Sequence, residues 1–188
     1  MIESALSSVV AELNQFLKLK FQLTEDAVII SNLANLDGSI AVKEINKVVV
    51  TLVNIQEDRL ATKKGSPGKK IGENTPVFLN LHILISSHFD EKLISEALRF
   101  LSAVIAFFQN KGVFFPSNTP TLDNSIEKLV FEIVNQDLRE QSNLFSAIGV
   151  KYLPSVLYRM RMLAIDEESV HFISAPITEK GFDSGFDK

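Results

Sequence analysis

The chain has 188 residues and contains no cysteine. This absence excludes disulfides, thiolate metal sites and cysteine nucleophiles, and it leaves the redox compartment open. The three histidines, His82, His88 and His171, do not have the spacing of metal ligands. The sequence also lacks the G-x-G-x-x-G, P-loop and G-x-S-x-G motifs. We therefore expect no cofactor, no metal and no enzymatic activity.

Long apolar runs and a strong charge of one sign are also missing. No apolar run reaches the roughly 18 residues that a membrane span requires. The N-terminal segment carries Glu3 and no basic region, so we expect no secretory signal there. The net charge of −4 argues against nucleic acid as the main partner. Neither a membrane nor a nucleic acid is therefore an expected partner.

The apolar content of 46% is that of a protein with a packed core. A chain of this length suits one domain followed by a tail. We expect the domain to span residues 1–166. Residues 167–188 form a polar C-terminal tail, which we expect to be extended or docked on a partner.

Apolar periodicity predicts both the elements and their order along the chain. Helices are expected at 2–20, 91–111 and 137–148, and strands at 27–33, 47–57, 77–87, 128–134 and 156–164. This order favours an α+β fold with a single, mostly antiparallel or mixed sheet packed by three helices. The strands 47–57 and 77–87 should pair as neighbours. The first of them is apolar on both sides, which predicts cover on both faces.

Residues 128–165 form the most clearly punctuated part of the chain, a strand–helix–strand unit. Asp137 and Glu140 fit a capping box that begins the helix, and Gly149 can take the left-handed conformation that ends it. Pro154 then prevents the helix from continuing. The apolar stripe of this helix is expected to consist of Leu138, Leu144, Phe145 and Ile148.

A basic loop at residues 61–76 is the first candidate contact region. It carries Lys63, Lys64, Lys69 and Lys70 among glycines and prolines. One interpretation is a basic finger that touches an acidic partner, and the other is a solvated surface loop.

The last strand and the tail supply the other candidates. Arg159 and Arg161 share one side of the strand, where they can pair with Glu132 or contact another subunit. In the tail, Val170, Phe172 and Ile173 are apolar and β-prone. A lone strand does not stand by itself in water, so this segment either docks on another chain or folds back on its own sheet.

Several segments together resemble a known family. They are IESALSSVVAEL, VVVTLVNIQED, LNLHILISSHF, ALRFLSAVIAFFQ and, most specifically, NLFSAIG followed by YLPSVLYRMRMLAI. The chain resembles the N-terminal domain family of tail-terminator, or cap, proteins of contractile injection systems, over roughly residues 1–166. The resemblance implies a homo-hexameric ring that caps the inner tube and anchors the last sheath layer. It implies inner-tube and sheath proteins as partners, and assembly in the bacterial cytoplasm into a contractile particle.

Two alternatives to the cap remain open. One is an assembly adaptor that is not retained in the particle. The other is a small-ligand-binding domain or enzyme in which the apolar helix 91–111 lines a pocket. That alternative requires convergent polar groups, which the sequence does not show.

Overall fold

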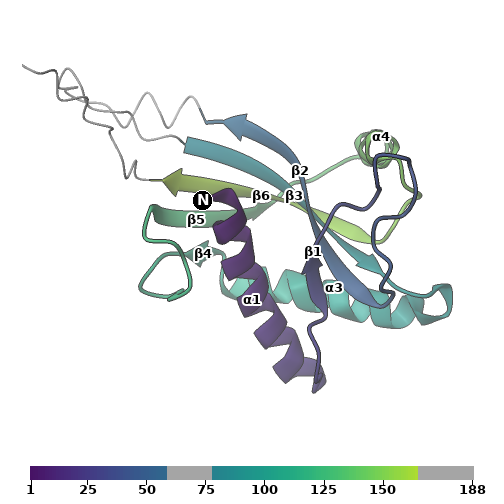
Figure 1. Ribbon diagram of the computed structural model, residues 1–188, viewed down its shortest axis with the longest axis horizontal. Helices are drawn as coiled ribbons and strands as arrows, with labels where there is room; N and C mark the ends of the chain where they lie inside the picture. Colours follow the sequence, from purple (N-terminus) through teal and green to yellow (C-terminus); the bar gives the residue numbers. More distant parts are fainter. Residues whose placement is uncertain (59–77, 165–188) are drawn as a thin grey trace, which may run out of the picture.

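The computed structural model describes residues 1–58 and 78–164, which form an α+β fold (Figure 1). In chain order the elements are α1 (Ile2–Phe21), β1 (Val28–Ile30), β2 (Lys47–Glu57), β3 (Phe78–His88), a 3-10 turn η1 (Glu91–Leu93), α3 (Ile94–Asn110), β4 (Val113–Phe114), β5 (Ile126–Ile133), α4 (Leu138–Ile148) and β6 (Ser155–Ala164). Within the described residues, three α-helices therefore pack on a six-stranded sheet. The fold class expected from the sequence is confirmed.

The strands lie in the order β1-β2-β3-β6-β5-β4. β1 pairs with β2 in parallel, and the other neighbours are antiparallel, so the sheet is mixed. β2 and β3 pair along their length, from Lys47 opposite His88 to Glu57 opposite Leu79. This pairing confirms the prediction that the two long strands are neighbours in the sheet. β6, the last strand in the sequence, lies in the middle of the sheet.

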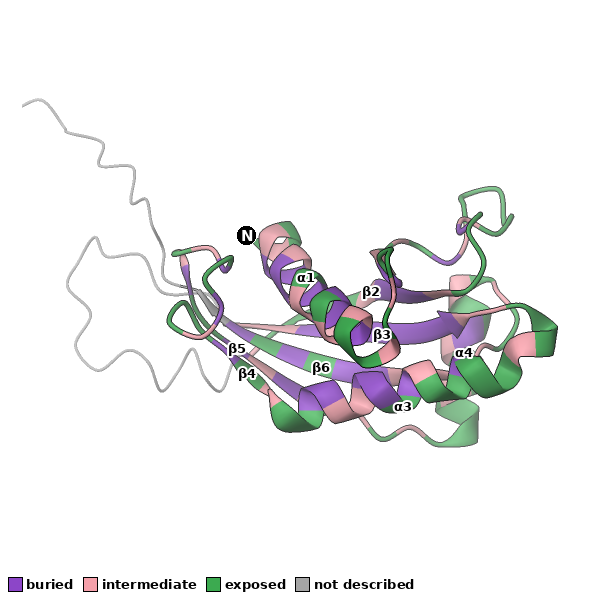
Figure 2. Cartoon of the chain, turned by 90° about the horizontal axis from the view of Figure 1, so that it is seen from below, coloured by how far each residue is buried: buried purple, intermediate pink, exposed green. Residues whose placement is uncertain are grey.

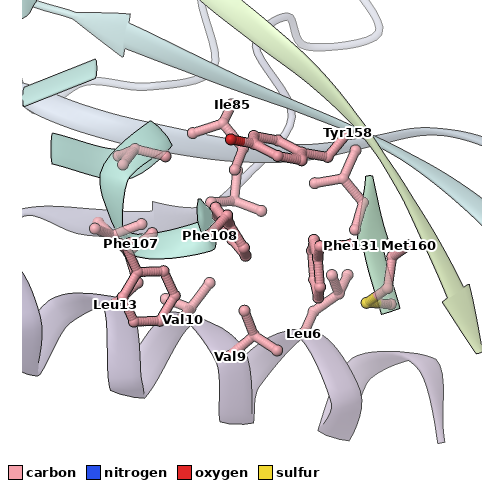
Figure 3. Close-up of a cluster of buried hydrophobic side chains, with 14 of the residues drawn as sticks. Leu6, Val9, Val10, Leu13, Ile85, Phe107, Phe108, Phe131, Tyr158 and Met160 are labelled. Atoms are coloured by element: carbon pink, nitrogen blue, oxygen red, sulfur yellow. The ribbon is translucent and has the colours of Figure 1, made fainter. Parts of the chain in front are cut away.

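One face of the sheet is covered by α1 and α3 (Figure 2). An aromatic cluster lies at the centre of this core (Figure 3). The ring centroid of Phe108 is 4.5 Å from that of Phe131 and 4.6 Å from that of Tyr158. Rings at these separations attract one another beyond the area that they bury. Leu6, Val9, Val10 and Leu13 of α1 complete the layer.

The opposite face is covered over only part of its area. α4 and the segment 31–46 bury a second apolar cluster there, which consists of Leu33, Val42, Val49, Leu84, Phe145 and Leu157. Val48 and Val50 belong to the first cluster and Val49 to the second. The start of β2 is therefore buried on both sides, as its apolar sequence predicts.

α3 and the turn before it are apolar enough to need a structural explanation. By length and composition alone, the helix Glu91–Asn110 would be able to cross a membrane. Its apolar side is used in the core, where the rings of Phe107 and Phe16 lie 5.4 Å apart. Phe100 also lies off the main stripe and stacks on Phe21 at 4.5 Å. Core packing thus accounts for the apolar residues in the second half of this helix, whereas Ile94 and Leu98 near its start remain 50% and 49% exposed.

Three details differ from the sequence predictions. Val113 and Phe114 form β4, whereas their sequence indicates a loop, because a two-residue strand is too short to show alternation. Leu138 is 86% exposed and does not belong to the apolar stripe of α4, since it lies in the first turn, beyond the residues that reach the sheet. Ile133 shares the apolar side of its strand with Leu129 and Phe131, which predicts burial, but it is 46% exposed because β4 pairs only with Leu129 and Val130 and leaves the end of β5 open.

Candidate protein-binding surface

The uncovered part of the second sheet face is polar, and we call it the polar half-sheet. Its polar residues in the strands are Asn54 and Gln56 of β2, Asn80 and His82 of β3, Arg159 and Arg161 of β6, and Lys128 and Glu132 of β5. Asp58 and the apolar Phe78 and Val130 line a hollow on the same surface together with Lys128 and Arg161. The strand register brings them together, since His82 pairs with Arg159, and Arg159 with Glu132. Within the described residues no helix covers this half, so its side chains face solvent or a partner.

Glu132 lies between two guanidinium groups on the polar half-sheet. Arg159 Nη2 donates to Glu132 Oε2 at 2.7 Å, and Arg161 Nη2 donates to Oε1. The hydrogen bond from Arg159 and the positive charge of Arg161 lower the pKa of Glu132. These contacts confirm that the two arginines pair with Glu132 of the same chain, one of the two possibilities that the sequence left open. Both arginine side chains nevertheless remain 44% and 47% exposed, so they can still donate to a further group.

His82 lies beside Arg159 and is half-buried. Burial, and then the charge of Arg159, lower the pKa of its imidazole. Within the described residues, His82 Nδ1 and Asn80 Oδ1 are buried and have no hydrogen-bond partner. The lowered pKa favours the neutral imidazole, so the positive charge of this surface comes from its arginines and Lys128.

A second candidate surface is an open groove of about 460 Å³ between the end of α1 and the start of α3. Phe21, Phe89 and Phe100 line it, so α3 does contribute to a hollow, as the ligand-binding alternative requires. Its polar rim makes structural contacts instead: Arg99 lies 5.7 Å from the ring centroid of Phe21, and Asp26 pairs with Lys18 at 2.8 Å. The groove offers an aromatic surface rather than a catalytic arrangement.

The turn at residues 35–39 presents a leucine to solvent. Gly38 N donates to Asn35 O at 3.0 Å, and Ser39 N donates to Asp37 Oδ1 at 2.9 Å. The hydrogen bonds from Ser39 lower the pKa of Asp37 and hold the turn together. Leu36 is fully exposed at its tip. An apolar side chain on an ordered turn is suited to contact another protein.

Sequence reasoning missed this leucine and the polar half-sheet for different reasons. The Asp37-Gly38 pair indicated a turn, but nothing in the local pattern shows that Leu36 points away from the core. The polar half-sheet depends on the register of four strands, which single-strand patterns do not supply. The available signal was the alternation along each strand, which places polar residues on one side and apolar residues on the other.

The remaining candidate residues lie outside the described residues. These are Lys63, Lys64, Lys69 and Lys70 of the loop, and Val170, Phe172 and Ile173 of the tail. The loop joins Glu57 to Phe78, and both lie at the same end of the sheet as Arg161. Among the described residues there is no group of three histidine, aspartate or glutamate side chains that could hold a metal ion.

Comparison with known proteins gives both a family and a fold. Residues 6–179 match the model of the family described as the Pvc16 N-terminal domain. The anti-feeding prophage cap (AFP tube terminating cap) is similar in structure, with a TM-score of 0.54 and 17% identity over 85% of this chain and 55% of that one. So is the PVC sheath/tube terminator of an extracellular contractile injection system in the extended state, with a TM-score of 0.55 and 17% identity over 96% of this chain and 63% of that one.

This chain therefore spans between about half and two thirds of the length of those two structures. At this level of identity the likeness is one of fold. No curated protein sequence matches the chain significantly.

Proposed function

Because this chain belongs to the Pvc16 N-terminal domain family, we propose that it is a structural cap, or tail terminator, at the distal end of a contractile injection system. It would end the polymerisation of the inner tube and anchor the last layer of sheath. The observation that carries the proposal is that two solved structures of this fold are a tube terminating cap and a sheath/tube terminator. The role is structural, without catalysis and without a cofactor.

We propose a homo-hexameric ring, with the inner-tube and sheath proteins as partners. A closed ring needs two different contact patches on each subunit, because neighbours meet head to tail. The exposed Leu36 and the rings of Phe21, Phe89 and Phe100 in the groove are suited to such a contact, since each offers apolar surface within polar surroundings. The polar half-sheet is a separate surface. Assembly would take place in the bacterial cytoplasm, and the cap would then remain in the contractile particle.

The test is to mix the purified protein with the inner-tube protein of the same system. We expect shorter tubes, a ring at one end with six-fold symmetry in averaged end views, and a matching mass by mass photometry. A protein that stays monomeric and never enters particles contradicts the proposal. A protein that promotes assembly but is absent from finished particles supports the adaptor instead.

Two leucines provide a matched pair for the ring contact. Leu36→Ser should weaken the ring at the tube end without changing the stability of the subunit, because the side chain is already fully exposed. Leu19→Ser on α1 removes another exposed leucine, with 76% exposure, and should leave the ring intact. If the two variants form rings equally well, the turn that carries Leu36 is not part of the ring interface.

A further inference from the structure

The turn at residues 35–39 carries a leucine and an acid that the described part of the subunit leaves uncovered. Leu36 is fully exposed, and the next residue, Asp37, is exposed as well. Asp37 Oδ1 accepts from Ser39 N at 2.9 Å and from Ser39 Oγ at 2.6 Å, which holds the turn in one conformation. Asp37 Oδ2 accepts no hydrogen bond from the described residues. The turn therefore presents an apolar side chain next to a carboxylate oxygen that has room for a donor.

The groove between the end of α1 and the start of α3 offers the complementary groups. The ring centroid of Phe100 lies 4.5 Å from that of Phe21 and 5.2 Å from that of Phe89, and all three rings are only partly buried. Arg99 lies over the ring of Phe21 and pairs with no acid among the described residues. A guanidinium beside partly exposed rings can bind a carboxylate while the rings take up an apolar side chain.

The charges of the groove are mixed, so the fit is local rather than one of net charge. Besides Arg99, the charged residues of its lining are Glu25, Asp26, Lys47 and Glu96. Asp26 pairs with Lys18 at 2.8 Å, and Lys47 pairs with Glu44 at 3.4 Å. Arg99 is therefore the base of the lining that remains for an incoming acid.

Two acids of the lining also remain for an incoming base. Glu25 and Glu96 make no ion pair within residues 1–58 and 78–164. The segment that carries the turn has charges of both signs, since Lys43 is exposed like Asp37. The turn and the groove thus match in apolar surface and in charge.

We propose that the turn of one copy docks in the groove of the next copy, with Leu36 among the rings and Asp37 Oδ2 accepting from Arg99. The two surfaces belong to opposite faces of the sheet (Figure 1). Residues 31–46 pack with α4 on the second apolar cluster, whereas the rings of the groove pack on the cluster beneath α1 and α3. A subunit therefore does not fill its own groove, and the contact runs head to tail between copies. The inference rests on the proposed ring and names the two patches that would form it.

Single cysteines test this contact, because the natural chain contains none. Ile40→Cys places a thiol beside the turn without changing Leu36, at a side chain that is 62% exposed. Thr24→Cys places one on the lining of the groove. The two proteins are mixed with the inner-tube protein and treated with a bismaleimide linker, and we expect a covalent dimer of one chain of each kind. Ser102→Cys, exposed on α3 outside the groove, is the control and should not link to Ile40→Cys.

Tube length measures the proposed function separately from the crosslink. Capped tubes that give no mixed dimer, or that give dimers of Ile40→Cys alone, would overturn the inference and leave the proposed function standing. Tubes that keep growing would contradict the proposed function. In that case a mixed dimer in concentrated protein without tubes would still support the contact, and its absence would overturn it.

Charge variants identify the carboxylate and the guanidinium. Asp37→Asn, made in the chain with the turn cysteine, keeps the side-chain oxygen that the turn needs and removes the charge. Arg99→Gln is made in the chain with the groove cysteine. Each should slow formation of the mixed dimer by about five-fold, and the two together should slow it no further, because groups in contact are not additive. Arg139→Gln removes an exposed guanidinium from α4 and should have no effect. Additive effects of Asp37→Asn and Arg99→Gln would overturn the pairing of these two groups.

Discussion

Asn14 of α1 fixes the start of the first strand. Its Nδ2 donates to Val28 O at 2.9 Å, and its Oδ1 accepts from Ala27 N at 2.9 Å and Val28 N at 2.8 Å. The side chain is buried among apolar residues. One amide therefore satisfies three backbone groups that water does not reach.

Replacing Asn14 by alanine should lower the free energy of unfolding by about 3 kcal/mol, because a buried group without a partner costs roughly 1–3 kcal/mol. Urea denaturation followed by circular dichroism measures the change. Gln15→Ala removes an amide from the exposed side of the same helix and should change stability little. A loss below about 1 kcal/mol for Asn14→Ala would mean that the three backbone groups find other partners.

Tyr158 presents the opposite case, a buried polar group with no partner in the described part of the chain. Its hydroxyl lies in the aromatic core (Figure 3), and burial raises its pKa to about 12. Tyr158→Phe should therefore raise the free energy of unfolding, by about 1 kcal/mol. The exposed Tyr152 serves as the control, since its change to phenylalanine relieves no burial. A clear loss of stability in Tyr158→Phe would show that the hydroxyl binds an internal water.

At the scale of elements, the parts set by short-range chemistry could be predicted from the sequence. The capping box of Asp137 and Glu140 and the left-handed Gly149, with φ of +82°, are observed as expected. Both depend on neighbouring residues only. The parts set by strand register could not be predicted, because no single strand contains that information. The polar half-sheet and the exposure of Ile133 belong to this second kind.

The capping box also gives a prediction for α4. Asp137 Oδ1 accepts from Glu140 N at 2.7 Å, and Glu140 Oε2 accepts from Asp137 N at 3.0 Å. Asp137→Ala should lower stability by about 1 kcal/mol, the usual contribution of an N-cap. Hydrogen exchange should show faster opening of the first turn of α4. Ser142→Ala, in the middle of the helix, should not accelerate exchange there; equal acceleration in both variants would contradict the cap's role.

At the scale of the whole molecule, the basic loop is a separate candidate contact. If Lys63, Lys64, Lys69 and Lys70 meet acidic groups on tube or sheath, changing all four to serine should weaken capping and leave the domain folded. Exposed ion pairs contribute only about 0–1 kcal/mol each to stability. Particle length and yield are the measurements, with the melting temperature as the check on folding. Unchanged particle length and yield would instead support the interpretation of residues 61–76 as a solvated surface loop.

The extent of the domain remains a prediction from the sequence. The boundary at residue 166 lies two residues beyond the end of β6, whereas the family match continues to residue 179. Val170, Phe172 and Ile173 of the C-terminal tail lie beyond this boundary and within the family match.

The central place of β6 has a consequence for how the protein is made. The ribosome delivers β1, β2 and β3 first and β5 later, but β3 and β5 are joined only through β6. Until residues 155–164 leave the exit tunnel, the inner edge of β3 has no neighbour, and α1 and α3 lack the core residues Tyr158, Met160 and Met162 that they pack against. Contacts between strands so distant in sequence form slowly, because a long loop must close first. The nascent chain must therefore complete its sheet after most of it has been synthesised, and the exposed edge of β3 is where a chaperone or a second nascent chain would bind before then.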